Sequence, residues 1–441
     1  MIELSPLVVM LIMFGSLTVL LLTGMPVVFA LGGIGVILLL LLWGTKVMPS
    51  IVPGSAFYVM TWYVILAIPL FIFMSMILRS SGVVEDLFRS IRLWLARIPG
   101  GLAMACVLVC VITSAMSGLT ATGVLILGII AVPLMLKFGY SKEIAIGPVL
   151  AAAALASLIP PSDTFIVYGA LALVSVGQLF IGGIIPGLIL ASLFIIYIGI
   201  RCYLNPELGP PLPPEERVSW WGKIVSLRAL VLPGALIIAI LGSIFMGICS
   251  PTEAAGVGAM GALVIAAIKR KLTWQALKEA CIETVKISSM VMWIFFAATI
   301  FKSVFVLSGG PHFVTDWIVG LGIAPLGVIG VMQVAFILLG MFVQTLVMLL
   351  IGMPVFLPVV DALGLSRVWF GVLFLANSQI GDLTPPFGSA LFYMRSIAPE
   401  GVTMADIIRS VLPLIPLQVI GVLLVLFFPQ LALWLPGLML G

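Results

Sequence analysis

The stretch Ser157-Leu158-Ile159-Pro160-Pro161-Ser162-Asp163 has a counterpart, Asp382-Leu383-Thr384-Pro385-Pro386-Phe387-Gly388, in which Pro385 lies 225 residues after Pro160. A proline removes a backbone donor and clashes with the preceding turn, so two in succession end helical hydrogen bonding and leave free carbonyls. Both stretches lie within long apolar segments. We therefore predict two helices, each of which is broken midway.

The composition is that of a protein that crosses a membrane many times. Of the 441 residues, 63% are apolar and 8% are charged, against about 25% charged in an ordinary soluble domain. Apolar runs at 4–22, 27–43, 184–200 and 419–435 approach or reach the roughly 20 residues that cross a bilayer. The run at 4–22 follows no basic segment and precedes no convincing cleavage site, so we expect a span there and not a signal peptide.

In lipid, the carbonyls that a broken helix leaves free must find partners. Irregular backbone at membrane depth is tolerated where it is packed in protein or lines a polar cavity. A pair of interrupted apolar segments in corresponding halves of a chain is typical of a transporter's binding site.

The 225-residue offset matches more than the prolines of the two breaks. The other matched pairs include Pro26 with Pro251, Gly33 with Gly258, Thr120 with Thr345, Pro133 with Pro358, Ser141 with Ser366 and Tyr168 with Tyr393. We therefore predict two repeats, residues 1–200 and 229–441. The segment 201–228 between them is rich in proline and cannot form an apolar span, so we interpret it as a linker.

The charges predict the orientation of the repeats. Lys and Arg mark cytoplasmic loops, and one topology places all of the 20 basic residues inside except Lys46, Lys302 and Arg367. The same topology places the linker inside and both termini outside. The two repeats would then have opposite orientations, the inverted arrangement of many secondary transporters.

Each repeat is predicted to begin with a frame, 1–98 in the first and 229–323 in the second. The first frame has spans at 4–22 and 26–43, a short polar link, a span at 62–80 and an amphipathic surface helix at 83–98. The second has spans at 229–246, 250–268 and 285–307 and a surface segment near 310–323.

The rest of each repeat, 101–200 and 324–441, is predicted to hold a re-entrant helical hairpin, a broken span and a last span. The first hairpin covers 101–136 with its tip near Ser117–Thr120, and its broken span covers 143–170, before a last span at 179–200. The second hairpin covers 324–358 with its tip near Phe342–Thr345, and its broken span covers 369–394.

With these stretches assembled, the chain resembles the large membrane subunit (DctM-like, M subunit) of tripartite ATP-independent periplasmic (TRAP) transporters. The resemblance covers essentially the whole chain. The stretches that carry it are Ile68-Pro69-Leu70-Phe71, Ile159-Pro160-Pro161-Ser162 with Val167-Tyr168-Gly169, Gly182-Gly183-Ile184-Ile185-Pro186-Gly187, Ser250-Pro251-Thr252-Glu253-Ala254-Ala255 and Leu383-Thr384-Pro385-Pro386-Phe387-Gly388.

The resemblance implies an all-α inner-membrane importer of small organic acids that is coupled to sodium and uses an elevator-type fold. Its implied partners are a small membrane subunit (DctQ-like) and a periplasmic substrate-binding protein (DctP-like), together with membrane lipid; no nucleic acid is expected. No cofactor is implied beyond sodium as the coupling ion. One departure is Gln344, because the second hairpin of the family commonly carries an acidic residue there, so the charge balance of this site differs.

Hairpin tips that face broken helices can supply the several oxygen ligands that sodium needs, from carbonyls and hydroxyls on both sides. Helix N-termini at the breaks also direct partial positive charge toward an anion. In the first repeat the candidate substrate and ion ligands are Ser114, Ser117, Gly118, Thr120, Ser157, Pro160, Ser162 and Asp163. In the second repeat they are Gln344, Thr345, Asn377, Asp382, Thr384 and Gly388. The alternative is that these small polar residues pack helices or satisfy one another.

Four ionisable residues fall inside predicted spans, where a charge is unfavourable by at least about 2.5–3.5 kcal/mol. We assign Asp163 and Asp382, which flank the breaks, to ion or substrate chemistry. Glu253 follows Pro251 at a helix start, where capping is the simpler role. Lys302 needs a carboxylate partner that the sequence does not identify. The five cysteines predict neither a disulfide framework nor a metal site, and the single histidine, His312, is expected to be solvated near the outer surface.

Two alternatives remain at this point. Asp163 and Asp382 are two buried carboxylates, as in an intramembrane aspartyl protease, although proteolysis does not require a double proline beside each of them. The other alternative is an ion-coupled anion transporter of the same fold that works alone, without a binding protein.

Overall fold

The computed structural model describes residues 4–118, 120–216, 218–320, 322–386 and 388–439, with the side chains of Ser117 and Val319 left out. Regular structure in this part of the chain is helical, and it contains no β-strand. Nine of the described helices are long and apolar enough to cross a membrane. The chain is therefore an all-α polytopic membrane protein, as the composition predicts.

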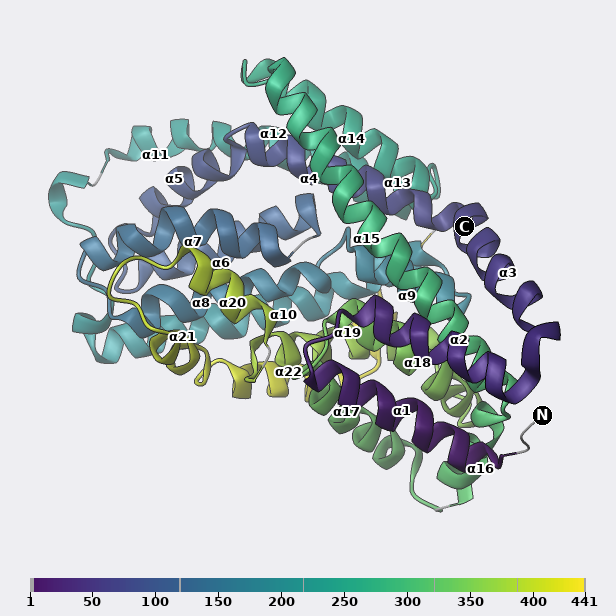
Figure 1. Ribbon diagram of the computed structural model, residues 1–441. Helices are drawn as coiled ribbons and strands as arrows, with labels where there is room; N and C mark the ends of the chain where they lie inside the picture. The colour runs from purple at the N-terminus through teal and green to yellow at the C-terminus, as the bar shows by residue number, and fades with distance from the viewer. Residues whose placement is uncertain (1–3, 119, 217, 321, 387, 440–441) are drawn as a thin grey trace.

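The first half of the chain contains ten α-helices (Figure 1). They are α1 (Pro6–Leu22), α2 (Val27–Trp43), α3 (Met48–Thr61), α4 (Ala67–Ser80), α5 (Val83–Leu95), α6 (Gly101–Ser117), α7 (Thr120–Lys137), α8 (Lys142–Ala154), α9 (Asp163–Ala172) and α10 (Val176–Leu204). Short 3₁₀ segments precede α3 (Gly44–Lys46) and α4 (Tyr63–Leu66) and follow α8 (Leu155–Ser157).

The second half continues with shorter and longer helices. They are α11 (Trp220–Ser226), α12 (Arg228–Ile237), α13 (Ser243–Phe245), α14 (Pro251–Ile268), α15 (Trp274–Leu307), α16 (Gly310–Gly320), α17 (Pro325–Gly340), α18 (Thr345–Ala362), α19 (Arg367–Leu383), α20 (Ser389–Ile397), α21 (Met404–Val411), α22 (Ile415–Phe427) and α23 (Gln430–Leu433). A π-helical turn at Ile238–Gly242 joins α12 to α13, and 3₁₀ turns occupy Pro206–Leu208, Pro214–Glu216 and Pro436–Leu438.

The structure confirms both predicted helix breaks and the amphipathic helix of the first half. α8 and its 3₁₀ extension end at Ser157, and α9 begins at Asp163. α19 ends at Leu383, and α20 begins at Ser389. α5 buries Val83, Val84, Leu87, Phe88 and Ile91, a spacing that places these side chains on one face of a helix.

The predicted polar link between the second and third spans is wrong. Residues Met48–Thr61 form the helix α3. Pro49 lies in its first turn, where a missing backbone donor is harmless because first-turn N–H groups have no partner within the helix. Phe57 and Met60 are 70% and 84% exposed, so this stretch is an apolar helix with little protein around it.

Helices from the two halves pack together. The long helix α15 runs diagonally across Figure 1 and contacts α2 and α4, while α14 also packs on α4. Elsewhere α6 and α7 contact each other and α8, whereas α17 and α18 contact each other and α19. The last helices complete these contacts, because α21 packs on α8 and α22 packs on α19.

The proline-rich segment between the halves is folded back onto helix ends. The backbone N–H of Gly100 donates to the Gly209 carbonyl at 2.7 Å, and that of Leu212 donates to the Ala96 carbonyl at 3.0 Å. The indole of Trp94 on α5 donates to the Lys223 carbonyl of α11 at 3.2 Å. The middle of the predicted linker is tied to the end of α5 and the start of α6. The predicted bounds are too wide, because residues 201–204 end the candidate span Val176–Leu204 and residues 220–228 begin the candidate span Trp220–Phe245.

Candidate functional site

The first break is bridged by the hydroxyl of Ser162. The Ser162 hydroxyl donates to the Ser157 carbonyl at 2.7 Å and accepts from the backbone N–H of Phe165 at 3.4 Å. Ser162 thus caps α9 while binding the last residue of the preceding helix. The Ser157 hydroxyl donates to the Ala154 carbonyl at 3.0 Å. The carboxylate of Asp163, the first residue of α9, accepts from the Thr164 hydroxyl at 3.0 Å.

The second break is organised around Asp382, in the last turn of α19. Its side chain is buried, with 7% of the residue exposed. One carboxylate oxygen accepts from the Ser389 hydroxyl at 3.1 Å, and the other accepts from the Thr345 hydroxyl at 3.3 Å. Asp382 therefore links α19 to both α20, which follows the break, and α18, which begins at the tip of the second hairpin.

Each hairpin contacts its own broken helix through glycine. Gly118 ends α6 with a positive φ of 63°, and a methyl group there would overlap the Pro161 carbonyl oxygen. At the second hairpin, a methyl group on Gly381 would come within 2.7 Å of Gly340 Cα. Backbone therefore meets backbone at both places, and only glycine permits these approaches.

One cavity of about 380 Å³ brings the two hairpin tips and the two breaks together. Seven of the predicted site residues line it: Gly118, Thr120, Ser157, Asp163, Gln344, Thr345 and Asp382. A neighbouring cavity of about 290 Å³ is also lined by Gln344 and Asp382. The two tip-and-break sites, predicted separately for the two repeats, thus line one cavity, and the role of their residues as ligands stays a prediction.

Six other predicted residues, all described by the structure, do not line this cavity. Ser114 and Asn377 are 3% and 0% exposed, and the Asn377 amide donates to the Gln333 carbonyl at 2.8 Å. Pro160 and Ser162 are buried within the first break. The Thr384 hydroxyl donates to the Ile380 carbonyl at 2.5 Å. Gly388 lies against the backbone of Asp382 and Leu383, and the Ser117 side chain lies outside the described residues.

The cavity is also lined by residues that were not among the predicted ligands. Ser389 and Tyr393 line it, and both match first-repeat residues at the 225-residue offset, Thr164 and Tyr168. The 225-residue offset was thus a signal that could have identified Ser389 and Tyr393 as site residues. Arg79 at the end of α4 and Glu283 on α15 also line the cavity. They come from outside the hairpins and broken helices, and no local motif marks them.

The two aspartates do not match each other at the 225-residue offset. At the 225-residue offset Asp163 falls on Gly388, and Asp382 falls on Ser157. Asp163 begins the helix that follows its break, whereas Asp382 ends the helix that precedes its break. Each half of the chain therefore contributes one carboxylate to the cavity, from opposite sides of the two breaks.

The remaining charged residues fall into simpler roles. Glu253 accepts from the backbone N–H of Ser250 at 2.7 Å and completes a capping box at the start of α14, as predicted. Lys302 forms no ion pair within the described chain, and it lines a cavity of about 250 Å³ beside the Asp361–Arg367 pair. His312 is exposed, as expected.

Trp369, where the second broken span was predicted to begin, is 2% exposed and donates its indole N–H to the Val425 carbonyl at 2.8 Å. The five cysteines are free. In the described part of the chain, no three His, Cys, Asp or Glu side chains gather as a metal site.

A many-span helical protein whose two broken helices share a cavity is of the transporter class. Residues 14–431 match the family described as tripartite ATP-independent periplasmic transporter, DctM component. The chain belongs to this family, and the resemblance seen in the sequence is confirmed. Because family members are transporter membrane subunits, the chain is a transporter subunit and not an enzyme, which sets the aspartyl-protease alternative aside.

Two relatives and one solved structure illustrate the match. The chain is 30% identical over 440 residues to the C4-dicarboxylate TRAP transporter large permease protein DctM of Vibrio cholerae, with 95% of each covered. It is 32% identical over 436 residues to the ectoine/5-hydroxyectoine TRAP transporter large permease protein UehC of Ruegeria pomeroyi, covering 96% of this chain and 98% of that one. The YdaH transporter of Alcanivorax borkumensis has a similar fold, with a TM-score of 0.65 at 14% identity over 94% of this chain and 98% of that one.

Proposed function

We propose that this chain carries a small organic acid into the cell together with sodium, through the cavity between the hairpin tips and the breaks. The observation that supports this most directly is the meeting of both tips and both breaks at one cavity. A carboxylate substrate would find the guanidinium of Arg79 there, and the start of α9 directs partial positive charge toward the same space. The Vibrio relative, a C4-dicarboxylate permease by name, supports an acid of this class.

Sodium would bind near the two breaks. Asp382 with the hydroxyls of Thr345 and Ser389 offers three oxygen-bearing side chains at the second break. At the first break, Asp163 with Thr164 and the carbonyl of Pro161 beside Gly118 offers a similar set. Oxygen ligands of this kind suit a hard cation. Gln344 lines the same cavity without a charge, so the site would carry less negative charge than one with an acidic residue there.

We infer that the two halves are inverted repeats and that transport moves one unit against another. The static frame would be α1–α5 with α12–α16, and the moving unit would be the hairpins, broken helices and last helices. Contacts of α2 and α4 with α14 and α15 support the frame. The six ion pairs support the division as well, because none joins a described frame residue to a residue of the moving unit.

The partners follow from membership of a tripartite family. A periplasmic binding protein would deliver the acid, and a small membrane subunit would stand beside the frame. The chain would lie in a bacterial inner membrane with the linker in the cytoplasm and both termini in the periplasm. This orientation rests on the sorting of basic residues.

The proposal is tested by uptake of labelled C4-dicarboxylates into vesicles that contain the full chain. Four conditions combine the presence or absence of an inward sodium gradient with the presence or absence of the binding protein and small subunit. We expect uptake only when the gradient and both partners are present. Gradient-driven uptake without the partners would favour the stand-alone transporter, and uptake indifferent to sodium would contradict the coupling.

A further inference from the structure

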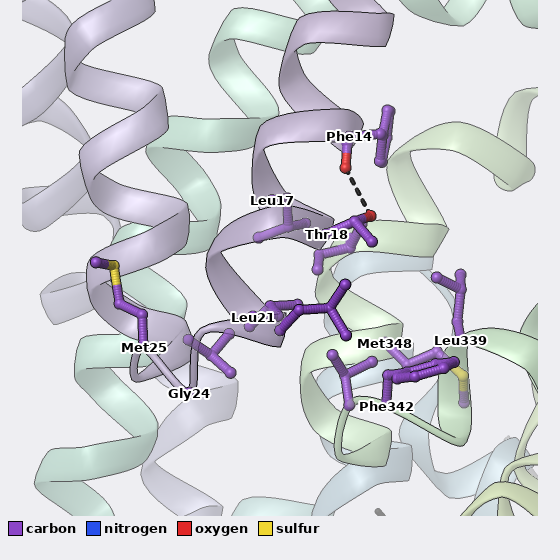
Figure 2. Close-up of a pocket in the computed structure, with 13 residues that line it drawn as sticks. Phe14, Leu17, Thr18, Leu21, Gly24, Met25, Leu339, Phe342 and Met348 are labelled. Atoms are coloured by element: carbon purple, nitrogen blue, oxygen red, sulfur yellow. Dashed lines mark hydrogen bonds between the residues drawn. The ribbon is translucent and has the colours of Figure 1, made fainter. Parts of the chain in front are cut away.

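An apolar pocket lies between the first two helices and the second hairpin, away from the polar cavity. Its volume is about 380 Å³, and Figure 2 shows α1 side chains on one side and side chains from the hairpin on the other. Leu17 from α1 and Met348 from α18 lie deep in it, with 5% and 0% of their surfaces exposed. The pocket therefore has walls from the proposed frame and from the proposed moving unit.

The side chains that line the pocket offer almost no polar group to which a polar ligand could bind. Thr18 carries the only polar side-chain group among the described residues that line the pocket. Its hydroxyl already donates to the Phe14 carbonyl within the same helix, at 2.8 Å (Figure 2). Apolar cavities of this kind stay dry. Water, sodium and a carboxylate are therefore poor occupants.

The rim of the pocket is open and equally apolar. Leu22 and Phe342 line it and are 61% and 47% exposed. α2 and α18 are both of membrane-spanning length and hydropathy, and we therefore infer that this apolar rim faces lipid hydrocarbon. An unfilled space against such walls forfeits dispersion contacts. A flexible acyl chain can fill it, whereas a helix about 10–12 Å across is too wide for a pocket of this size.

We propose that this pocket binds one acyl chain of a membrane phospholipid. The chain would lie against Val343 and Met348, which flank the hairpin tip residues Gln344 and Thr345. Thr345 in turn donates to Asp382 in the polar cavity. The bound acyl chain thus packs beside the hairpin tip, and its length or unsaturation tunes how readily the tip moves.

Binding is tested without any transport measurement, so its outcome is separate from that of the proposed function. The full chain is placed in vesicles of phosphatidylcholine with a diazirine at the end of one acyl chain, irradiated, and digested for mass spectrometry. We expect cross-links in the segment 339–351. Leu17→Trp fills the pocket, and it should lower this cross-link yield by about tenfold, equivalent to about 1.4 kcal/mol.

Leu11→Trp is the matched control, because Leu11 is on the same helix, is 65% exposed and does not line the pocket. It should leave the yield unchanged. Should Leu17→Trp lower the thermal midpoint, Leu17→Phe provides a milder filling, and it should give an intermediate yield. Equal labelling of 339–351 in Leu17→Trp and wild type would overturn the proposal. So would loss of labelling when the small membrane subunit is added, which would make a protein side chain the occupant.

The regulatory consequence rests on the proposed function and has its own readout. In wild type, initial uptake rates should change with acyl chain length, and in Leu17→Trp this dependence should disappear. Uptake that varies equally with lipid in both proteins would overturn the regulatory role while leaving the binding result intact.

Discussion

The hydroxyl of Thr345, the first residue of α18, donates to the carboxylate of Asp382 at the end of α19 across 3.3 Å. This contact joins the tip of the second hairpin to the second break. The two residues are 37 apart in the chain, so the bond reports tertiary structure and not a local turn. A cation bound here would draw on oxygens from both elements at once and would fix the tip to the broken helix.

Replacing Asp382 with Asn should weaken the sodium dependence of transport. Hydrogen bonds to charged groups contribute about 1.5–3 kcal/mol each, so losing the charge should raise the half-saturating sodium concentration by about tenfold or more. Asp163→Asn should act in the same direction. The measurement is uptake rate against sodium concentration, with membrane insertion followed by quantitative blotting. If the dependence of uptake rate on sodium concentration were unchanged in both variants, the two aspartates would have a packing role and no role in sodium coupling.

Gly118→Ala should abolish transport because the added methyl group overlaps the Pro161 carbonyl oxygen. Gly364→Ala is a matched control, since Gly364 has a similar positive φ, 66° against 63° for Gly118, and open space around its would-be methyl group. Both variants carry the same backbone strain, about 1–2 kcal/mol. Only Gly118→Ala also disturbs the contact between the tip of the first hairpin and the first break. Equal uptake by the two variants would contradict this role for the hairpin tip.

Arg79→Gln should raise the KM for an organic acid while leaving the sodium response unchanged. Arg79 is exposed at the cavity, and a charge in such a position contributes about 0.2–1 kcal/mol, or roughly a 1.4- to fivefold change in KM. Arg79→Lys should keep most of the affinity. Arg89→Gln, at an exposed position on α5 away from the cavity, is the control. A KM that shifts equally in Arg79→Gln and Arg89→Gln would indicate a general charge effect.

The helix ends could be predicted from the sequence because capping is local. Ser141 and Ser366, matched at the 225-residue offset, accept from backbone N–H groups and begin α8 and α19. Thr120 and Thr345, also matched, are the first residues of α7 and α18. A cap or a proline acts within one turn, so residues that match at the 225-residue offset can mark corresponding helix boundaries.

The contacts between distant elements could not be predicted in this way. Arg79 lies in the last turn of α4, but its place at the cavity depends on how α4 packs. Ser162 is the opposite case. It was predicted as a ligand, but its hydroxyl donates to the Ser157 carbonyl within the break and does not face the cavity. A small polar side chain takes whichever acceptor tertiary packing brings near, and neither spacing nor periodicity records that choice.

A cysteine at Ser219 should react with impermeant thiol reagents from the cytoplasmic side only. Ser219 is exposed at the start of α11 in the proline-rich segment. A cysteine at His312, which is exposed on α16, should react from the opposite side. The measurement uses intact cells and inverted vesicles after replacement of the native cysteines, of which Cys281 is exposed. Labelling of both positions from one side would contradict the inverted arrangement.

Cross-linking across the cavity should stop transport if one unit moves against the other. Ala121 on α7 and Met290 on α15 line the same cavity from the proposed moving unit and the proposed frame. A pair of cysteines at these positions, joined by a short bifunctional thiol reagent, should trap one state and abolish uptake, and reductive cleavage of the reagent should restore it.

The matched control confines the cross-link to the moving unit. Lys142 on α8 and Asp406 on α21 form an ion pair at 2.9 Å, so cysteines at both positions can be joined by the same reagent. Transport should then continue, because these helices would travel together with the substrate. Each single-cysteine variant, treated identically, measures the effect of modification alone. Efficient cross-linking of Ala121→Cys to Met290→Cys with undiminished uptake would exclude rigid movement of the unit and would favour local opening of the hairpins around a fixed site.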